Sequence, residues 1–109
     1  MRQPILITGA TGTLGRAFAR ICVERDLGCV VLTRQEMDIA NPTSVESAIL
    51  RHHPWAIINA SGYVNVDKAE LEPELCFREN LIGPSVLAKA CVQHEVQLTY
   101  PLAFMIAHG

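Results

Sequence analysis

The chain has 109 residues, half of them apolar, and its 9 lysines and arginines against 11 aspartates and glutamates give a formal net charge of −2. This length supports one modest hydrophobic core but not a second full domain, so we expect a single soluble domain over 1–109. The near balance of charge offers no general attraction to nucleic acid or to an anionic membrane.

The cysteines and the apolar runs bear on the location of the protein. Four cysteines occur without a short paired spacing: Cys22, Cys29, Cys76 and Cys91. The first residues lack the charged-then-apolar order of a signal peptide, and no apolar run is long enough to span a bilayer. We therefore expect reduced thiols and a cytoplasmic protein.

The first predicted elements are a buried strand, a helix and a second buried strand. The short apolar run Ile5–Ile7 is typical of a central parallel strand. Apolar residues then recur at the spacing of one helix face: Leu14, Phe18, Ile21 and Cys22. We expect Gly28 to end this helix and Cys29–Leu32 to form the second strand.

A second helix and a third strand follow. Asn41 can cap free backbone amides, and Pro42 suits the first helical position because its missing N–H would be unpaired there anyway. The apolar face of this helix comprises Val45, Ala48 and Ile49. Pro54 is expected to stop the helix, and the apolar run 55–58 to form a third strand that leads into the small-residue loop 59–62. Trp55, at the start of that strand, is expected in the core.

A long helix and a fourth strand complete the pattern. Pro73 can open the helix, whose apolar positions are Leu75, Cys76, Ile82, Val86, Leu87, Ala90 and Cys91. Pro84 cannot donate a hydrogen bond to the carbonyl of Asn80, so we expect a kink there. Strand character returns at Val96–Thr99. The alternation of strands and helices predicts an α/β fold with a parallel sheet of about four strands, in the order 3-2-1-4, covered by helices on both faces.

Three glycines at three-residue intervals lie between the first strand and the first helix. Gly9 allows a tight turn, Gly12 lets the backbone approach a phosphate without a Cβ in the way, and Gly15 lets the helix pack closely on the strand. The free amides of the first helical turn and the positive end of the helix dipole then face the anion. In this strand-turn-helix context the pattern predicts binding of a dinucleotide's pyrophosphate.

The Gly-x-x-Gly-x-x-Gly spacing resembles that of the short-chain dehydrogenase/reductase superfamily, especially its extended sugar-nucleotide branch, and implies a Rossmann-type fold. Further stretches narrow the resemblance to the dTDP-4-dehydrorhamnose reductase family: Arg-Gln-Glu-Met-Asp-Ile at 34–39, Ile-Asn-Ala-Ser-Gly-Tyr at 58–63, Val-Asp-Lys-Ala-Glu at 66–70 and Glu-Asn at 79–80. That family reduces a 4-keto sugar nucleotide with NAD(P)H in the last step to dTDP-L-rhamnose. The resemblance, which runs from about residue 5 to residue 99, implies the NAD(P)-binding portion of such an oxidoreductase.

The resemblance also implies positions for the cofactor. The pyrophosphate would be held by Gly9, Thr11, Gly12, Thr13, Leu14 and Gly15. Asp38 and Ile39 would meet the adenine. The loop after the third strand would line the nicotinamide side with Ala60, Ser61, Gly62, Tyr63 and Val64. All three groups follow the carboxyl ends of predicted parallel strands, where open α/β sheets bind ligands.

The residues after the second strand bear on the choice of cofactor. The chain has Thr33-Arg34 there and lacks the acid, expected about 20 residues past the glycines, that bonds the ribose 2′-hydroxyl of NAD. Arg34 can instead pair with a 2′-phosphate. We therefore expect NADP rather than NAD, with an ordinary exposed arginine as the alternative.

Several polar groups have both a structural and a functional interpretation. In the superfamily an asparagine on the long helix supports the active site, and both interpretations stay open for Asn80. Residues of the Val-Asp-Lys-Ala-Glu stretch are either a solvated helix start or part of the site: Asp67, Lys68 and Glu70. The histidines lack the spacing of metal ligands, so we expect surface positions and no metal site for His52, His53, His94 and His108.

No catalytic residue is predicted in these 109 residues. Reduction in this superfamily needs a Tyr-x-x-x-Lys pair, in which the lysine lowers the pKa of the tyrosine that donates a proton. Tyr63 is followed four residues later by Asp67, and Tyr100 by Phe104. Residues 100–109 also depart from the family pattern. We expect the chain to be inactive alone and to meet a sugar-nucleotide substrate only when the rest of an enzyme is supplied.

Three origins of the short match stay open: a shortened or frame-shifted reductase, a segment cut from a longer protein, and a stand-alone dinucleotide-binding module. The competing functions are accordingly a non-catalytic NAD(P)-binding sensor or scaffold and a remnant that binds no ligand. A sheet that stops after its fourth strand leaves an edge and apolar surface uncovered. We therefore expect a homo-oligomer formed through that edge, or poor solubility.

Overall fold

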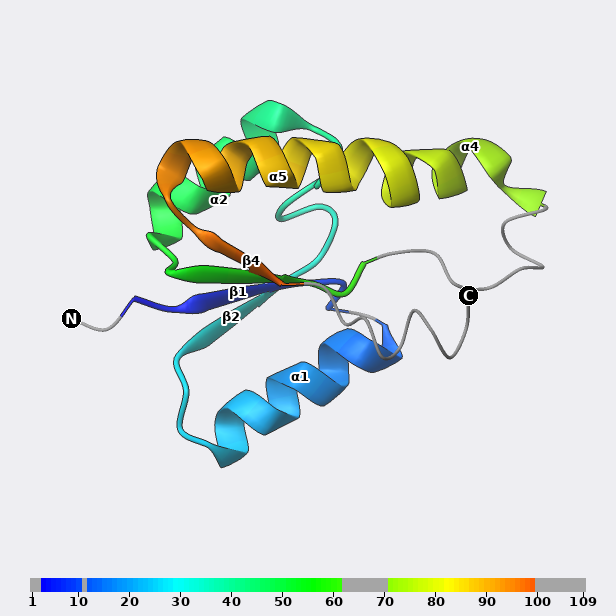
Figure 1. Cartoon of the computed structure of the whole chain (residues 1–109). Helices are drawn as coiled ribbons and strands as arrows, with labels where there is room; N and C mark the ends of the chain where they lie inside the picture. Colours follow the sequence, from blue (N-terminus) through cyan, green and yellow to red (C-terminus); the bar gives the residue numbers. More distant parts are fainter. Residues whose placement is uncertain (1–2, 11, 62–70, 100–109) are drawn as a thin grey trace.

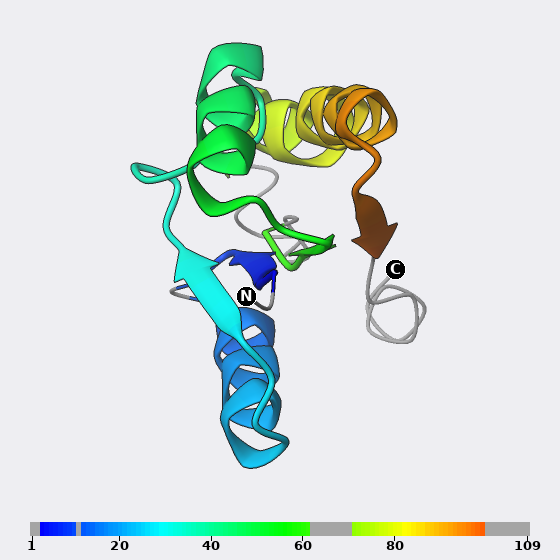
Figure 2. The ribbon, with the colours of Figure 1, turned by 90° about the vertical axis from the view of Figure 1, so that its left-hand side faces the viewer.

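The computed structural model describes residues 3–10, 12–61 and 71–99, which form a parallel four-stranded sheet between two layers of helices (Figure 1). The strands are β1 (Ile5–Thr8), β2 (Cys29–Leu32), β3 (Ala56–Asn59) and β4 (Gln97–Thr99). Helix α1 (Thr13–Glu24) covers one face of the sheet, and α2 (Pro42–His52) lies on the other with a long helical segment (Figure 2). The expected Rossmann-type α/β fold is confirmed.

The strands follow the order β2-β1-β3-β4, so the predicted order 3-2-1-4 is wrong. Ile5 of β1 is paired with Cys29 of β2 on one side and with Ala56 of β3 on the other. All four residues of β1 are buried, whereas three of the four in β2 are only half-buried. The fold thus places β1, the strand that is completely buried, inside the sheet and β2 at an edge of the described sheet. The connection from β2 through α2 crosses over β1, so β3 pairs with β1 on the side opposite β2.

Helix α1 forms as expected but ends earlier than predicted. Cys22 is buried against the sheet, while Ile21, on the same predicted stripe, is 46% exposed. The helix ends at Glu24, and Asp26 takes the left-handed conformation with φ 54°. The predicted stop at Gly28 is therefore wrong, because an aspartate two residues earlier makes the turn.

Helix α2 begins and ends as predicted. The side-chain oxygen of Asn41 accepts hydrogen bonds from the backbone N–H groups of Thr43 at 3.0 Å and Ser44 at 3.4 Å. His53, in the left-handed conformation with φ 48°, and Pro54 end it. The predicted apolar face is buried at Val45, Ala48 and Ile49.

The long helical segment contains a π-helical turn in the middle. It comprises α4 (Pro73–Phe77), the π-helix η1 (Arg78–Ile82) and α5 (Gly83–His94). Pro84 stands at the start of α5, immediately after the wide turn. Because proline has no N–H for the regular ladder, the irregularity expected at Pro84 takes the form of a π turn rather than a break.

Each face of the sheet has its own apolar cluster. The larger one lies under α2 and α5 and includes Leu6, Met37, Val45, Ile57 and Leu87. The smaller one lies against α1 and comprises Ile5, Ile7, Cys22 and Ala56. Within the described part of the chain, no helix is both long and apolar enough to cross a membrane.

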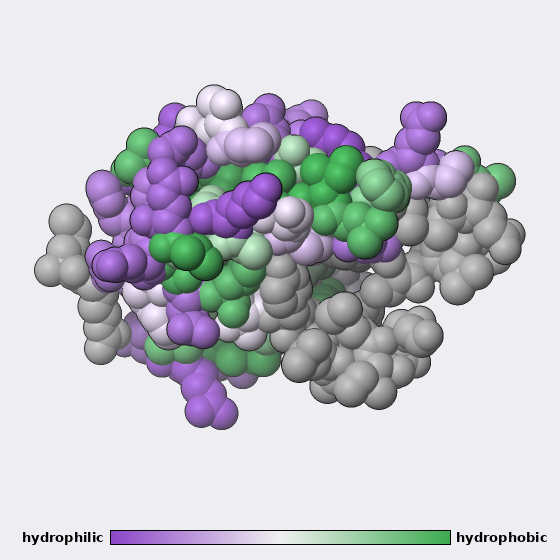
Figure 3. Space-filling view, turned by 45° about the horizontal axis from the view of Figure 1, so that its top comes forward, coloured by the Kyte–Doolittle hydropathy of each residue, from purple (hydrophilic) through white to green (hydrophobic). Residues whose placement is uncertain are grey.

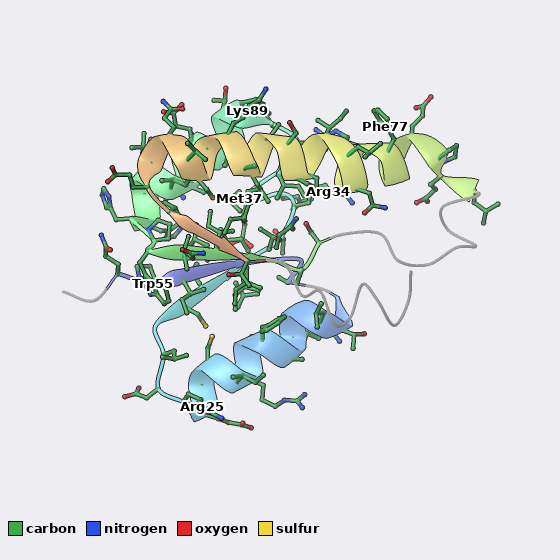
Figure 4. The ribbon with its side chains drawn as sticks, viewed as in Figure 1. Arg25, Arg34, Met37, Trp55, Phe77 and Lys89 are labelled. Carbon is green, nitrogen blue, oxygen red and sulfur yellow. The ribbon has the colours of Figure 1, made fainter. Side chains whose placement is uncertain are left out.

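Two side chains depart from their expected positions. Trp55, immediately before β3, is 50% exposed, so its prediction as a core residue is wrong (Figure 4). Its backbone N–H donates to the carbonyl of Pro4 at 3.1 Å. His94, expected at the surface, is half-buried at the end of α5, with Nε2 3.4 Å from Oε1 of Glu46 on α2.

Candidate functional site

The glycine turn joins β1 to α1 at the carboxyl end of the central strand. Gly9 has φ +78°, and a Cβ there would lie 2.6 Å from the carbonyl oxygen of Ala60. A Cβ on Gly15 would overlap the carbonyl of Gly9. Neither position can hold a side chain without moving backbone, so the turn and the helix start pack directly on each other and on the loop after β3.

The start of α1 presents backbone rather than side chains. Gly12 is the N-cap and has no side chain to accept hydrogen bonds from the first-turn amides. The first turn holds no acidic residue, and both Gly12 and Thr13 are exposed. Amides in such a turn, together with the positive end of the helix dipole, suit a negatively charged group.

A buried hydrogen-bond network joins the ends of β1 and β3. The hydroxyl of Thr8 donates to Oδ1 of Asn59 at 2.8 Å and accepts from the N–H of Ala60 at 3.2 Å. Oδ1 of Asn59 also accepts from the hydroxyl of Ser61 at 2.6 Å and from its N–H at 3.3 Å. Thr8 and Asn59 are 2% and 5% exposed, so these bonds fix the loop after β3 beside Gly9. Sequence reasoning missed both residues, although each is a polar residue that ends an apolar strand.

The segment after β2 begins with a side-chain-stabilised turn. Oε1 of Glu36 accepts from the N–H of Thr33 at 2.9 Å and from its hydroxyl at 3.0 Å. These hydrogen bonds from Thr33 lower the pKa of Glu36. Arg34 lies in this turn, is exposed, and stands on the side of the sheet that faces the long helical segment (Figure 4).

Asp38 is held by an arginine from η1. Nη1 and Nη2 of Arg78 donate to its two carboxylate oxygens at 2.8 and 2.6 Å. The backbone N–H of Asp38 donates to the hydroxyl of Ser44 at 2.9 Å, and Oδ1 accepts from the N–H of Ala40 at 3.1 Å. Hydrogen bonding to Arg78 holds the pKa of Asp38 below its usual range, against the opposing effect of burial. Arg78, 40 positions away in sequence, was not predicted as a site residue.

Ile39 is a core residue in the structure. Its side chain is 2% exposed and packs under the long helical segment, where a Cβ on Gly83 would overlap its Cδ1 atom. Only its backbone can therefore face a ligand at the surface. Asn80 lies in η1 and is exposed.

The structure brings most of the predicted site residues to the carboxyl end of the sheet or to η1. Those it describes are Gly9, Gly12, Thr13, Leu14, Gly15, Arg34, Asp38, Ile39, Ala60, Ser61 and Asn80. Outside the described residues lie Thr11, Gly62, Tyr63, Val64, Asp67, Lys68 and Glu70, and also 100–109. In the described ranges, no group of three His, Cys, Asp or Glu side chains is placed to hold a metal ion.

Comparison with known proteins shows a consistent set of relatives. The model of the family described as RmlD substrate binding domain matches residues 1–106. The dTDP-4-dehydrorhamnose reductase of Aggregatibacter actinomycetemcomitans is 41% identical over 92 residues, which are 84% of this chain and 31% of that protein. The same enzyme of Streptomyces griseus is 38% identical over 86 residues, 79% of this chain and 28% of that protein.

Solved structures agree with the sequence relatives. The dTDP-4-dehydrorhamnose reductase of Bacillus anthracis, in complex with NADP, matches with a TM-score of 0.79 and 28% identity over 90% of this chain and 35% of that one. An orthologue from Clostridium acetobutylicum matches with a TM-score of 0.78 and 32% identity over 87% of this chain and 34% of that one. The chain thus spans about a third of the length of the proteins that it matches.

Proposed function

Because the chain belongs to the RmlD substrate binding domain family, we propose that it is the NADP-binding portion of a dTDP-4-dehydrorhamnose reductase-like oxidoreductase. The observation that carries the proposal is the close packing of Gly9 on Ala60 and of Gly15 on Gly9, which holds the turn against the start of α1. The exposed backbone of Gly12 and Thr13 then forms the cradle for a pyrophosphate. The NADP complex of the Bacillus anthracis relative supports the choice of cofactor.

In this proposal each part of the site meets one part of the dinucleotide. The pyrophosphate lies against the turn and helix start formed by Gly9, Thr11, Gly12, Thr13, Leu14 and Gly15. Arg34 pairs with the 2′-phosphate, and Asp38 and the backbone of Ile39 border the adenine. Residues Ala60–Val64 flank the nicotinamide, and Asn80 supports the site from η1. The shared position of the described residues at the carboxyl end of a parallel sheet supports this arrangement.

The bound cofactor would supply a hydride for reduction of a 4-keto sugar nucleotide. Proton donation requires a positioned acid, and these 109 residues contain no Tyr-x-x-x-Lys pair. We therefore propose that they bind and orient the cofactor without turning over substrate. Turnover of dTDP-4-dehydrorhamnose by this chain alone, followed as NADPH oxidation, would contradict this part of the proposal.

Titration calorimetry with NADPH tests the binding proposal. Gly15→Ala places a methyl group against the Gly9 carbonyl and is expected to weaken binding at least about tenfold. Gly28→Ala is the matched control, because a Cβ there meets nothing within 4 Å. Equal affinities of the two variants would contradict the proposed cradle, and absence of binding by the unaltered chain would contradict the function itself.

A second candidate is a non-catalytic NAD(P) sensor or scaffold. Binding of NAD(P) through the same turn is common to this candidate and to the reductase. Cofactor binding that changes the affinity for a protein partner would support this function, whereas restored reduction when the remainder of a relative is supplied would favour the reductase.

We also propose self-association through the outer edge of β4, because an edge strand presents N–H and C=O groups that another strand can pair with. A cytoplasmic location is proposed as well. It is supported by Cys22, Cys29 and Cys91, which are free thiols.

A further inference from the structure

Two contacts fasten the segment after β2 to η1 and to the start of α5. Arg78 of η1 makes a bidentate ion pair with Asp38, and the neighbouring Ile39 side chain packs against the backbone of Gly83. The side chains of Arg78 and Asp38 are 38% and 24% exposed, so the pair lies at the surface of the site rather than in the core. The π turn therefore contacts the segment proposed to border the adenosine.

Asp38 lies within electrostatic reach of two arginines. Its pKa is lowered first by the hydrogen bonds from Arg78, and further by the positive charges of Arg78 and Arg34. Arg34 is the residue proposed to pair with the 2′-phosphate. A carboxylate that interacts with Arg34 would compete with the 2′-phosphate for it, unless another cation neutralised the carboxylate.

Arg78 provides that neutralisation with matched geometry. Its planar guanidinium engages both oxygens of Asp38 at once, an arrangement that a lysine cannot reproduce.

We propose that Arg78 is a specificity-determining residue that, by pairing with Asp38, favours NADP over NAD at this site. The inference rests on the proposed function, since it concerns which dinucleotide the same site selects. Arg78 acts through Asp38 and needs no contact of its own with the cofactor.

A double-mutant cycle on the full chain tests this inference, with NADPH and NADH each titrated by calorimetry. Arg78→Met is expected to weaken NADPH binding about tenfold and NADH binding by less than about twofold. Asp38→Asn in the same chain removes the unpaired carboxylate and is expected to return the affinity for NADPH to that of Asp38→Asn alone. The single variant is the reference because Asp38 is itself proposed to border the adenine. Arg25→Met is the charge-matched control, because Arg25 lies at the far end of α1 (Figure 4), and it should change neither affinity.

The titrations can overturn the role of Arg78 without overturning the proposed binding of a dinucleotide. If Arg78→Met weakens the binding of NADPH and NADH equally, or if adding Asp38→Asn does not restore the affinity for NADPH to that of Asp38→Asn alone, the ion pair only fastens the segment. Either result would overturn the inference. An unaltered chain that binds neither dinucleotide would overturn the proposed function together with it.

A milder variant covers the case in which Arg78→Met does not fold. Arg78→Lys keeps the charge but loses the bidentate contact, so the ratio of NADPH to NADH affinity is expected to fall about threefold. An unchanged ratio in the folded Arg78→Lys variant would overturn the inference.

Discussion

The hydroxyl of Thr8 is the residue-scale feature that joins the two central strands at the site. Thr8→Val keeps the shape of the side chain but removes one donor to Asn59 and one acceptor for Ala60, both part of a buried network. We expect a loss of about 2 kcal/mol in the free energy of unfolding, because buried polar groups are left unpaired. Urea denaturation measures the loss. Thr43→Val, at an exposed position, is the control and should change the free energy by less than about 0.5 kcal/mol.

The ion pair of Asp38 makes the free energy of unfolding depend on pH in the acid range. Its pKa is lower in the folded chain because of Arg78, so its contribution is complete above the unfolded value of about 3.9 and is lost as the pH falls through the folded value. The urea midpoint of the unaltered chain should therefore fall more steeply below about pH 4 than that of Asp38→Asn. Parallel profiles for the two proteins would contradict the ion pair.

The thiols of Cys29 and Cys91 should react slowly with alkylating agents. Burial raises the pKa of each to about 11, and the neighbouring Cys22 thiol contributes at Cys29. At pH 8 the smaller thiolate fraction, partly offset by higher nucleophilicity, predicts alkylation roughly tenfold slower than at an ordinary cysteine. Mass spectrometry of iodoacetamide-treated protein measures the rates, and a cysteine introduced by Ser47→Cys at an exposed position of α2 is the reference. Comparable rates at Cys29 and the reference would contradict the prediction.

At the scale of elements, the start of α2 could be predicted because a local sequence motif sets it. Strand order and side-chain burial depend on tertiary packing. Asn41 and Pro42 act within one helical turn, so the start of α2 could be read from the sequence. The strand order could not, because every predicted strand was apolar and only packing showed which belong at the centre. Trp55 departs from expectation for the same reason, because its burial depends on tertiary packing. At the end of α1 the local signal of Gly28 misled, since the helix ends before it is reached.

The candidate site likewise has one part that the sequence predicted and one part that it did not. The glycine turn was predicted because its chemistry lies within seven residues, Gly9 to Gly15. The ion pair between Arg78 and Asp38 was missed because its partners lie 40 positions apart in the sequence. It depends on how the long helical segment packs over the sheet and on the π turn that contains Arg78.

Removal of the α2 cap is the element-scale prediction. Asn41→Ala loses both side-chain hydrogen bonds to the first turn, so we expect the free energy of unfolding to fall by about 1 kcal/mol. Thermal unfolding followed by circular dichroism measures the change. Ser47→Ala, at an exposed position within the same helix, should match or slightly exceed the unaltered chain, and an equal loss in both variants would argue against the cap.

Within the described residues, exposed apolar side chains and an edge strand favour contacts between whole molecules. The long helical segment carries exposed apolar side chains at Phe77, Leu81, Ile82 and Val92, and apolar surface is visible on that face in Figure 3. β4 ends the described sheet on one side. Both features favour association between copies.

Sedimentation over a range of concentrations tests which feature drives this association. Gln97→Lys adds a charge to the edge strand β4, whereas Gln93→Lys makes the same change on α5. If copies pair through the edge, only Gln97→Lys should shift the protein toward monomer. A chain that stays monomeric at high concentration, or an equal shift by both variants, would contradict edge pairing.

The central place of β1 has a consequence for synthesis on the ribosome. β1 is made before both of its neighbours, and Asn59, the partner of Thr8 in β3, follows 51 positions later. Until β3 emerges, a nascent chain holds β1, a strand that is completely buried in the folded protein, with one side unpaired, even after α1 and β2 have formed. A chain stalled before residue 59 should therefore be a good chaperone substrate, and one extended through β4 a poorer one.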